Sequence, residues 1–408
     1  MKNLLPPHWS WMNLGAVCVK VEVAKRKEKN PNEEFLYLDI GGVDNTTNKI
    51  ISNKIYKWKD APSRAQQIIF QNDILFSTVR TYLKNIAIVE SKNYDGQIAS
   101  SGFTVIRANE KVATAKFLFY YSLSRSFLQP LNELQTGSSY PAVRDKDVFA
   151  QLTPLPPLPE QHLIVAKIEM LFSELDKGTE SLKTAQQQLK VYRQAVLKWA
   201  FENLPDEKDL IELVAEHAIG IVRSGSQQNE NGIGVPYIKM NNVDLNGNVD
   251  LENLVYVEAS KAEIERFGLQ KGDILINTRN SVELVGKTGI VRKENPQVVF
   301  NNNLLRIRIK NQYNPLFIGY QLVSPTLRKQ MTKEKKATTN VCALYQRDIF
   351  PLKIKVAEKE IQERIISEIE SRLSVCDKLE TTIEENLKKA EALRQSILKK
   401  AFEGKLIT

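Results

Sequence analysis

Apolar side chains recur along two long stretches of the chain at alternating steps of three and four residues. The first stretch runs from Val165 to Ala200 and the second from Ile366 to Ala401. This spacing is a heptad seam, the pattern of helices that pack together as a coiled coil. Neither stretch contains proline, and Pro159 and Gly404 stand where helices begin and end. The pattern predicts two helices of about 45 residues, each about 68 Å long.

The predicted seam is mainly aliphatic in both stretches. Its principal residues are Ile168, Phe172, Leu175, Leu182, Leu189 and Val196 in the first stretch, and Ile369, Leu373, Cys376, Ile383, Leu387 and Ile397 in the second. Arg193 and Arg394 occupy equivalent seam positions. We interpret them as arginines that snorkel past the edge of the seam to water. The alternative is a polar pair that sets the register or contacts a partner.

The two helices belong to an internal repeat. At an offset of 201 the first stretch and its flanks match the second at fourteen identical positions, among them Gln161 with Gln362 and Phe201 with Phe402. Upstream the match is weaker and the offset is 200. Self-similarity at a fixed spacing is a signal of the fold as a whole. The repeat predicts four segments: globular domains at 1–157 and 205–355, and helices at 158–204 and 356–408.

Each globular segment mixes short strands with short helices. Runs of β-branched and aromatic residues such as Phe103–Arg107 and Leu304–Ile309 alternate with Gly- and Asn-containing turns, and helical stretches are expected near Phe117 and Pro315. We therefore predict an α+β fold. The first helix leads away from the first domain and the second must return, so the helices should be antiparallel, with a pseudo-two-fold relation between the two halves.

The positive charge of the chain resides in its globular segments. The formal net charge is +9, with +6 in residues 1–157 and +4 in 205–355, against 0 and −1 in the two helical segments. This distribution favours a polyanion as the partner of the globular domains. The three cysteines fit no disulfide framework, and no stretch has the features of a signal peptide or membrane span. We expect a cytoplasmic protein without a membrane partner.

Candidate contact residues lie mostly on the turns that follow predicted strands. Their side chains are the usual donors to DNA phosphates and base edges, although solvated loops have the same composition. The DNA-binding candidates of the first domain are Thr78, Arg80, Tyr82, Lys84, Gly137, Ser138, Ser139, Tyr140 and Arg144. Those of the second domain are Arg223, Thr278, Arg279, Asn280, Lys287, Lys336, Thr338, Thr339 and Asn340.

Motifs for catalysis are missing from the sequence. There is no Gly-rich phosphate loop, no methyltransferase motif and no dinucleotide fingerprint, and the three histidines form no metal-ligand spacing. The acidic–basic tripeptides at Asp206–Lys208 and Glu334–Lys336 have no convincing partner acid on an upstream strand. We therefore predict no catalytic residue, no metal and no cofactor in this chain.

Several segments together resemble the specificity subunits of type I restriction–modification systems. They are the run Leu152–Gln161 (LTPLPPLPEQ) before the first helix, the opening His8–Gly15, the DIL–R turns at Asp73–Arg80 and Asp273–Arg279, and Gly137–Ser139. The resemblance covers essentially the whole chain, including its duplicated order. The second copy departs from the pattern, because Lys353–Glu358 lacks the prolines and Thr338–Asn340 replaces Gly-Ser-Ser.

The resemblance implies a concrete function. Such subunits carry two target recognition domains, and each reads one half of a bipartite, asymmetric site on double-stranded DNA. Their paired helices fix the unread spacer and dock two methyltransferase (M) subunits, and nuclease–translocase (R) subunits complete the complex. S-adenosylmethionine, ATP and Mg²⁺ are expected in those partners. Two other classes stay open on the residues alone: a stand-alone DNA-binding protein such as a repressor, and a coiled-coil scaffold whose domains bind proteins.

Overall fold

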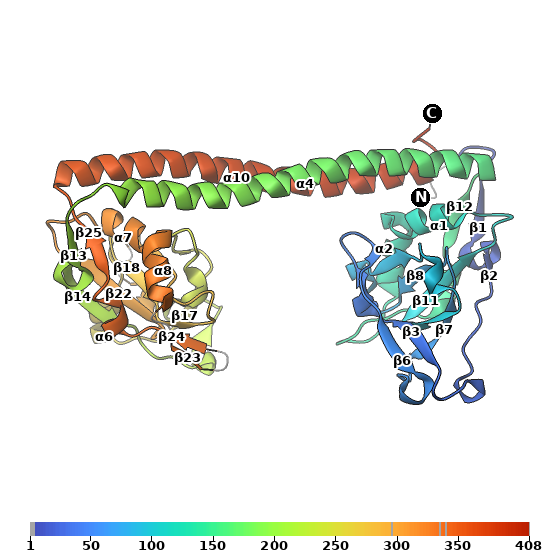
Figure 1. Cartoon of the computed structure of the whole chain (residues 1–408), viewed down its shortest axis with the longest axis horizontal. Helices are drawn as coiled ribbons and strands as arrows, with labels where there is room; N and C mark the ends of the chain where they lie inside the picture. Colours follow the sequence, from blue (N-terminus) through green and yellow to red (C-terminus); the bar gives the residue numbers. More distant parts are fainter. Residues whose placement is uncertain (1–4, 295–296, 334–335, 339–340, 408) are drawn as a thin grey trace. The chain divides into compact units, whose positions relative to one another are not determined.

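The computed structural model describes residues 5–294, 297–333, 336–338 and 341–407. The chain folds into two compact units whose boundaries fall inside the two long helices. The first unit comprises residues 1–182 and 384–408, and the second comprises residues 183–383. Each unit therefore contains one globular domain together with a part of both long helices (Figure 1).

The first domain has two four-stranded sheets. One has the strand order β6-β3-β10-β7 and the other β2-β11-β8-β9, and the strands β1 and β12 form a separate antiparallel pair beside the start of the first long helix. The strands are β1 Ser10–Asn13, β2 Cys18–Val19, β3 Glu34–Leu38, β4 Val43–Asp44, β5 Lys49–Ile50, β6 Lys54–Lys57, β7 Ala65–Ile69, β8 Ile74–Ser77, β9 Ile86–Ile88, β10 Gln97–Ser100, β11 Phe103–Ala108 and β12 Leu152–Leu155. The short helices are α1 Ala115–Ser122, α2 Arg125–Leu134 and α3 Asp145–Phe149.

The second domain repeats this plan with strand orders β14-β22-β18-β20 and β15-β17-β16-β21, and a three-stranded sheet β19-β24-β23 is added. Its strands are β13 Glu207–Asp209, β14 Val214–Ile219, β15 Gln228–Asn229, β16 Val235–Ile238, β17 Val255–Val257, β18 Ile274–Asn277, β19 Arg279–Asn280, β20 Thr288–Ile290, β21 Val299–Phe300, β22 Leu304–Ile309, β23 Lys336–Thr338, β24 Val341–Ala343 and β25 Lys353–Lys355. Its short helices are α5 Leu210–Leu213, α6 Lys261–Phe267, α7 Pro315–Val323, α8 Pro325–Lys333 and α9 Gln346–Ile349.

Matching strand directions show that the two domains share one framework. In the first domain β10 runs parallel to β3, and in the second β21 runs parallel to β16, while the other pairings within the four-stranded sheets are antiparallel. The predicted α+β fold with an internal repeat is therefore confirmed.

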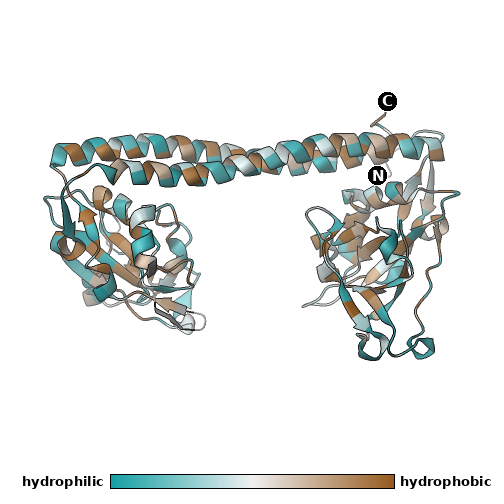
Figure 2. Cartoon of the chain, viewed as in Figure 1, coloured by the Kyte–Doolittle hydropathy of each residue, from teal (hydrophilic) through white to brown (hydrophobic). Residues whose placement is uncertain are grey.

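The long helices are α4 (Leu158–Glu202) and α10 (Lys359–Phe402), and they pack against each other as antiparallel partners. Hydrophobic and polar residues alternate along both of them (Figure 2). None of the twelve predicted seam residues is exposed: Ile168, Phe172, Val196, Ile369, Cys376, Ile383 and Ile397 are buried, and Leu175, Leu182, Leu189, Leu373 and Leu387 are half-buried. Each domain packs its own core onto the pair, as where Phe402 meets Phe117 at 5.2 Å and Phe201 meets Phe317 at 5.3 Å between ring centroids.

The two seam arginines are held in ion pairs. Arg193 is only 8% exposed and its guanidinium donates to Asp377 at 2.5 Å and to Glu380 at 3.0 Å. Arg394 pairs with Asp176 and lies over the ring of Phe172, 4.3 Å from its centroid. In each pair the arginine lies on one helix and its acidic partner on the other. This geometry differs from snorkelling at the seam edge and matches the alternative of a polar pair across the helices.

A buried glutamine fixes each domain to the first turn of its helix. Gln161 accepts the backbone N–H of Thr114 through Oε1 at 2.9 Å and donates through Nε2 to the carbonyl of Pro156 at 3.0 Å. Gln362, its repeat mate, accepts the N–H of Asn314 at 2.8 Å and donates to the carbonyl of Ala357 at 2.8 Å. A buried amide needs hydrogen-bond partners for its polar atoms, so these bonds are costly to break. They therefore fix the orientation of the first turn of each helix relative to its own domain.

Candidate nucleic-acid interface

The first candidate loop of the first domain is a tight turn after β8. Thr78 is buried and its hydroxyl donates to the carbonyl of Gly102 at 3.0 Å, so this side chain is engaged within the domain. Arg80 is half-buried, Tyr82 is exposed, and Lys84 forms an ion pair with Glu391 of α10 at 3.4 Å. The turn therefore offers Arg80 and Tyr82 to a ligand and ties Lys84 to the helix.

The second candidate loop folds against the first. Residues Gly137, Ser138, Ser139 and Tyr140 lie between Thr136 and Ala142, which form an antiparallel bridge. The Arg80 guanidinium donates to the carbonyl of Ser139 at 3.0 Å and lies over the Tyr140 ring, 4.8 Å from its centroid. The structure thus brings together two segments that are distant in sequence and were both predicted to face DNA.

Arg144 stands at the start of α3. Its Nε donates to Asp147 at 3.1 Å, and this hydrogen bond, with a second from the Arg144 backbone, holds the pKa of the Asp147 carboxyl below its usual value. The Arg144 side chain is otherwise largely exposed. It can therefore reach a phosphate only by sharing or leaving Asp147.

In the second domain, Arg279 and Asn280 form the short strand β19, which pairs with β24. The Arg279 side chain is exposed and Asn280 is half-buried. Thr278 repeats the arrangement of Thr78, since it is buried and its hydroxyl donates to the carbonyl of Asn303 at 3.0 Å. Arg279 is therefore a cation on β19 whose side chain is accessible to a ligand.

Two further candidates of the second domain are engaged inside it. Lys287 is buried, its ammonium donates to the carbonyls of Met240 at 3.0 Å and Val243 at 2.5 Å, and burial lowers its pKa. Arg223 pairs with Glu263 at 2.7 Å and donates to the carbonyl of Glu258. Lys287 and Arg223 thus brace loops of their own domain.

The remaining candidates lie at or beyond the described part of the chain. Lys336 and Thr338 belong to β23, of which only the backbone pairing with β24 is described. Thr339 and Asn340 lie outside the described residues.

The aspartates of the DIL–R turns have a structural role that the sequence did not reveal. Asp73 is 1% exposed and binds Arg107 of β11 through two hydrogen bonds at 2.6 and 2.7 Å. Asp273 is equally buried and binds Arg308 of β22 at 2.8 and 3.3 Å. Each aspartate also accepts a backbone N–H three residues earlier. The signal was present in the repeat, because Arg107 and Arg308 are also repeat mates.

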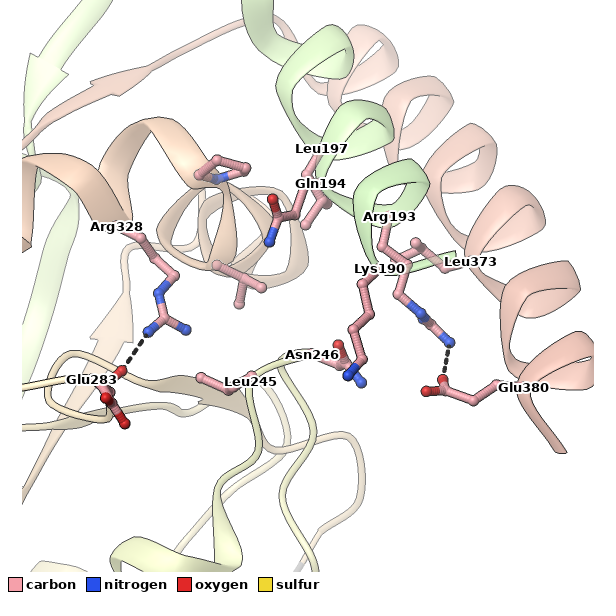
Figure 3. Close-up of a pocket in the computed structure, with 12 residues that line it drawn as sticks. Lys190, Arg193, Gln194, Leu197, Leu245, Asn246, Glu283, Arg328, Leu373 and Glu380 are labelled. Atoms are coloured by element: carbon pink, nitrogen blue, oxygen red, sulfur yellow. Dashed lines mark hydrogen bonds and ion pairs between the residues drawn. The ribbon is translucent and has the colours of Figure 1, made fainter. Parts of the chain in front are cut away.

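Sequence reasoning also missed a cleft between α4 and the second domain. It has a volume of about 470 Å³ and is lined by α4, α8, α10 and the loops at Asn246 and Glu283 (Figure 3). Arg328 projects from α8 into it and donates to the carbonyl of Glu283 at 3.4 Å, while burial lowers the pKa of its guanidinium. Lys190 projects from α4 toward Asn246. The cleft therefore contains both cations and the carboxylates of Glu283 and Glu380.

A cluster of metal ligands and a membrane-spanning helix are two patterns that the described residues do not contain. Within residues 5–294, 297–333, 336–338 and 341–407, no three His, Cys, Asp or Glu side chains gather as metal ligands would. Over the same part of the chain, no helix combines the length and the apolar character needed to cross a bilayer.

A duplicated α+β domain on paired helices, with basic loops at its strand ends, defines the class of the protein once it is compared with known families. The family model described as "Type I restriction modification DNA specificity domain" matches residues 6–190 and 208–389, so the chain belongs to this family. It is the DNA specificity subunit of a type I restriction–modification system and part of a complex that binds DNA.

Characterised relatives agree with this assignment. The chain is 28% identical over 312 residues to the type I restriction enzyme EcoKI specificity subunit of Escherichia coli (strain K12), which covers 73% of this chain and 67% of the relative. It is 26% identical over 322 residues to the EcoBI specificity subunit of Escherichia coli, covering 71% of this chain and 65% of the relative. The matched part thus spans about two thirds of each relative's length.

Solved structures match over nearly the whole chain. A chain of the structure "Structural basis underlying complex assembly and conformational transition of the type I R-M system" is 31% identical, with a TM-score of 0.82 and coverage of 98% of this chain and 99% of that one. The HsdS subunit from Thermoanaerobacter tengcongensis is also 31% identical, with a TM-score of 0.56 and 98% coverage of both chains.

Proposed function

We propose that the chain reads a bipartite, asymmetric DNA site, with one half-site for each domain. The observation that carries this proposal is one framework with two different sets of loops. Residues Arg80–Lys84 of the first domain form a compact 3-10 turn. The corresponding segment of the second domain instead starts as the strand β19. Different side chains on equivalent supports contact different base edges, so the two half-sites differ in sequence.

The proposed DNA contacts are the candidate side chains that the fold leaves accessible. In the first domain they are Arg80, Tyr82, Ser138, Ser139, Tyr140 and Arg144, and in the second Arg279 and Asn280. Lys336, Thr338, Thr339 and Asn340 belong to the same proposal by their place in the sequence. Thr78, Thr278, Lys287 and Arg223 support these loops from within. Phosphate contacts fix the register, and base contacts supply the specificity.

We propose that α4 and α10 act as a ruler for the unread spacer. Helices of this length extend about 68 Å, which is about two turns of B-DNA. Ion pairs between the helices, and the buried glutamines that join each helix to its own domain, support this role.

The same helices are proposed to dock two methyltransferase subunits, which nuclease–translocase subunits join in the full complex. Large apolar side chains on both helices face water: Leu163, Met170, Val191, Tyr192, Trp199, Val375, Leu379 and Leu393. Large apolar side chains exposed in this number on paired helices are typical of protein interfaces. Methylation and cleavage, with S-adenosylmethionine, ATP and Mg²⁺, belong to those partners in this proposal.

A selection of binding sites from a random DNA library tests the proposal. The chain would be purified together with the methyltransferase subunit of its system. Two conserved blocks at one fixed spacing are expected, with binding that weakens steeply as salt rises because phosphate contacts release counterions. A single block, or binding without any sequence preference, would contradict the two-domain mode of recognition.

A further inference from the structure

The first domain presents a preorganised apolar tip beside its candidate DNA-contact loops. The tip consists of Tyr82, Leu83 and Tyr140, which are 51%, 41% and 71% exposed. Tyr82 and Leu83 belong to the 3-10 turn η5 (Thr81–Leu83), and Tyr140 reaches the same place from the loop that folds over Arg80. Large apolar side chains that are exposed together on a basic loop indicate a surface that binds a partner.

The backbone of this turn is strained on both sides. Arg80 has φ 50° and Lys84 has φ 57°, so both adopt the left-handed conformation that side-chain-bearing residues disfavour. Among the described residues, the non-glycine residues with positive φ are Asn48, Asn72, Arg80 and Lys84, all in the first domain. Strain of this kind persists only where the surroundings enforce it, and it concentrates at functional sites.

The surroundings do enforce it. Thr81 is buried and its hydroxyl donates to Asn132 of α2 at 2.6 Å, while the backbone N–H of Arg80 donates to the carbonyl of Pro141 at 2.7 Å. Asn48 donates to the carbonyl of Lys84 at 3.1 Å. The tip is therefore preorganised, and it would lose little conformational freedom on meeting a ligand.

The Arg80 side chain is held ready for a ligand as well. Its guanidinium stacks on Tyr140, and its Nε is buried without a hydrogen-bond partner in the described part of the chain. A cation beside an exposed aromatic ring suits a ligand that has both an anionic backbone and flat apolar faces. Nucleic acid has both, since bases stack on aromatic side chains and phosphates pair with arginine.

In the described part of the second domain, the stretch that follows β18 has no exposed aromatic residue. At the offset of 200 that relates Asp73 to Asp273, Tyr82 and Leu83 fall on Val282 and Glu283, and Val282 is 55% exposed. Asn280 lies in the hydrogen-bonded strand β19, and Glu283 puts a negative charge where the first domain has a leucine. Among the described residues, the first domain thus has an aromatic tip, whereas the second has a smaller apolar residue beside an acidic one.

We propose that the apolar tip of the first domain wedges against or between base pairs and kinks its half-site, whereas the second domain reads its half-site without such a wedge. Apolar side chains inserted at a base step unstack it and bend the duplex, and pyrimidine–purine steps yield most easily. The first half-site is then selected partly by deformability. This inference rests on the proposed function, because it requires the first domain to bind DNA.

The test is a bend measurement by fluorescence energy transfer on duplexes that carry the selected site. Dyes flank either the first or the second half-site, and the protein is the complex with its methyltransferase subunits. We expect the wild-type complex to shorten the dye separation at the first half-site alone. Tyr82→Val, which installs the residue of the second domain, should abolish the kink and weaken binding about tenfold. Tyr82→Phe should keep the kink, and Val282→Ala should leave both half-sites unchanged.

Two outcomes separate this inference from the proposed function. Specific binding to a first half-site that stays straight, or a kink that survives Tyr82→Val combined with Leu83→Ala, would overturn the wedge alone. Failure of the wild-type complex to bind any specific site would overturn the proposed function and the wedge with it.

Discussion

The guanidinium of Arg193 on α4 donates to the carboxylate of Asp377 on α10 at 2.5 Å. The same bond recurs with the roles exchanged, since Arg394 on α10 pairs with Asp176 on α4, and these four residues are repeat mates. One duplicated sequence thus supplies both the donor and the acceptor of each pair. The reciprocal pairs define an antiparallel register that aliphatic seam residues alone would leave open to slippage.

Loss of the Arg193 pair should destabilise the second unit. Arg193→Met keeps the aliphatic part of the side chain but leaves Glu380 without its cation, so we expect the free energy of unfolding to fall by about 1–2 kcal/mol. Urea unfolding followed by circular dichroism measures this. Arg394→Met is the matched control and should have a smaller effect, because Arg394 is more exposed. Equal stability of wild type and Arg193→Met would refute a stabilising role.

Substitutions of the two loop arginines should separate the two half-sites. The Arg80→Ala variant should discriminate against changes in the second half-site as strongly as wild type does. Its discrimination against changes in the first half-site should fall by about 10- to 100-fold. Arg279→Ala should do the reverse. Competition binding with duplexes mutated in one half-site at a time is the measurement. Equal loss at both halves from either variant would count against separate readers.

The length of the helices should set the spacer. An insertion of seven residues after Leu182 together with seven after Ile383 adds about 10.5 Å and preserves the heptad phase. Selected sites should then keep both blocks and gain about three base pairs between them. The same insertion in one helix only is the control, and it should impair binding. An unchanged spacer in the double insertion would exclude the ruler.

The exposed Trp199 should contribute to partner docking. Its ring lies beneath the Arg372 guanidinium, 5.0 Å from the centroid, and its repeat mate is Lys400. Trp199→Lys should therefore be tolerated by the fold and should reduce the bound methyltransferase from two copies toward one, since tryptophan is a frequent interface hot spot. Native mass spectrometry counts the copies. Lys400→Ala serves as the control, and two retained copies in Trp199→Lys would place the docking surface elsewhere.

Stability at high pH should depend on Cys18. Burial raises the pKa of its thiol from 9.0 to about 12. The folded chain keeps this proton where the unfolded chain has lost it, so the contribution of Cys18 is constant below about pH 9 and declines as the pH rises toward 12. The slope is less than about 1.4 kcal/mol for each pH unit. Cys18→Ala should flatten the decline in chemical unfolding measured from pH 8 to 11. Parallel curves for both proteins would contradict the assignment.

Sequence patterns predicted the long helices and the repeat because these depend on local periodicity. The heptad spacing around Ile168 and Ile369 requires only that neighbouring turns share a face, and Pro159 and Gly404 mark the limits of the helices. The α+β character followed from short β-branched runs of the kind seen in β11 and β22.

Side-chain direction within loops was beyond the sequence. Thr78 and Arg80 stand two residues apart, yet the threonine bonds a carbonyl inside the domain while the arginine stacks on a tyrosine from another loop. The partners of Asp73 and Asp273 are arginines on a strand more than thirty residues away, and only the folded sheet brings them together. Lysine is a residue type that usually lies at the surface, but tertiary packing buries Lys287.

The buried clamps of Gln161 and Gln362 have a consequence for how such a ruler can change. Because each amide locks its domain to the first turn of a helix, every residue added to that helix would advance the domain by about 1.5 Å and also turn it by about 100°. Most lengths would point the recognition loops away from the groove that they must enter. If the helices act as the proposed ruler, the spacer can therefore change only in steps that restore both the seam and the azimuth of the domain.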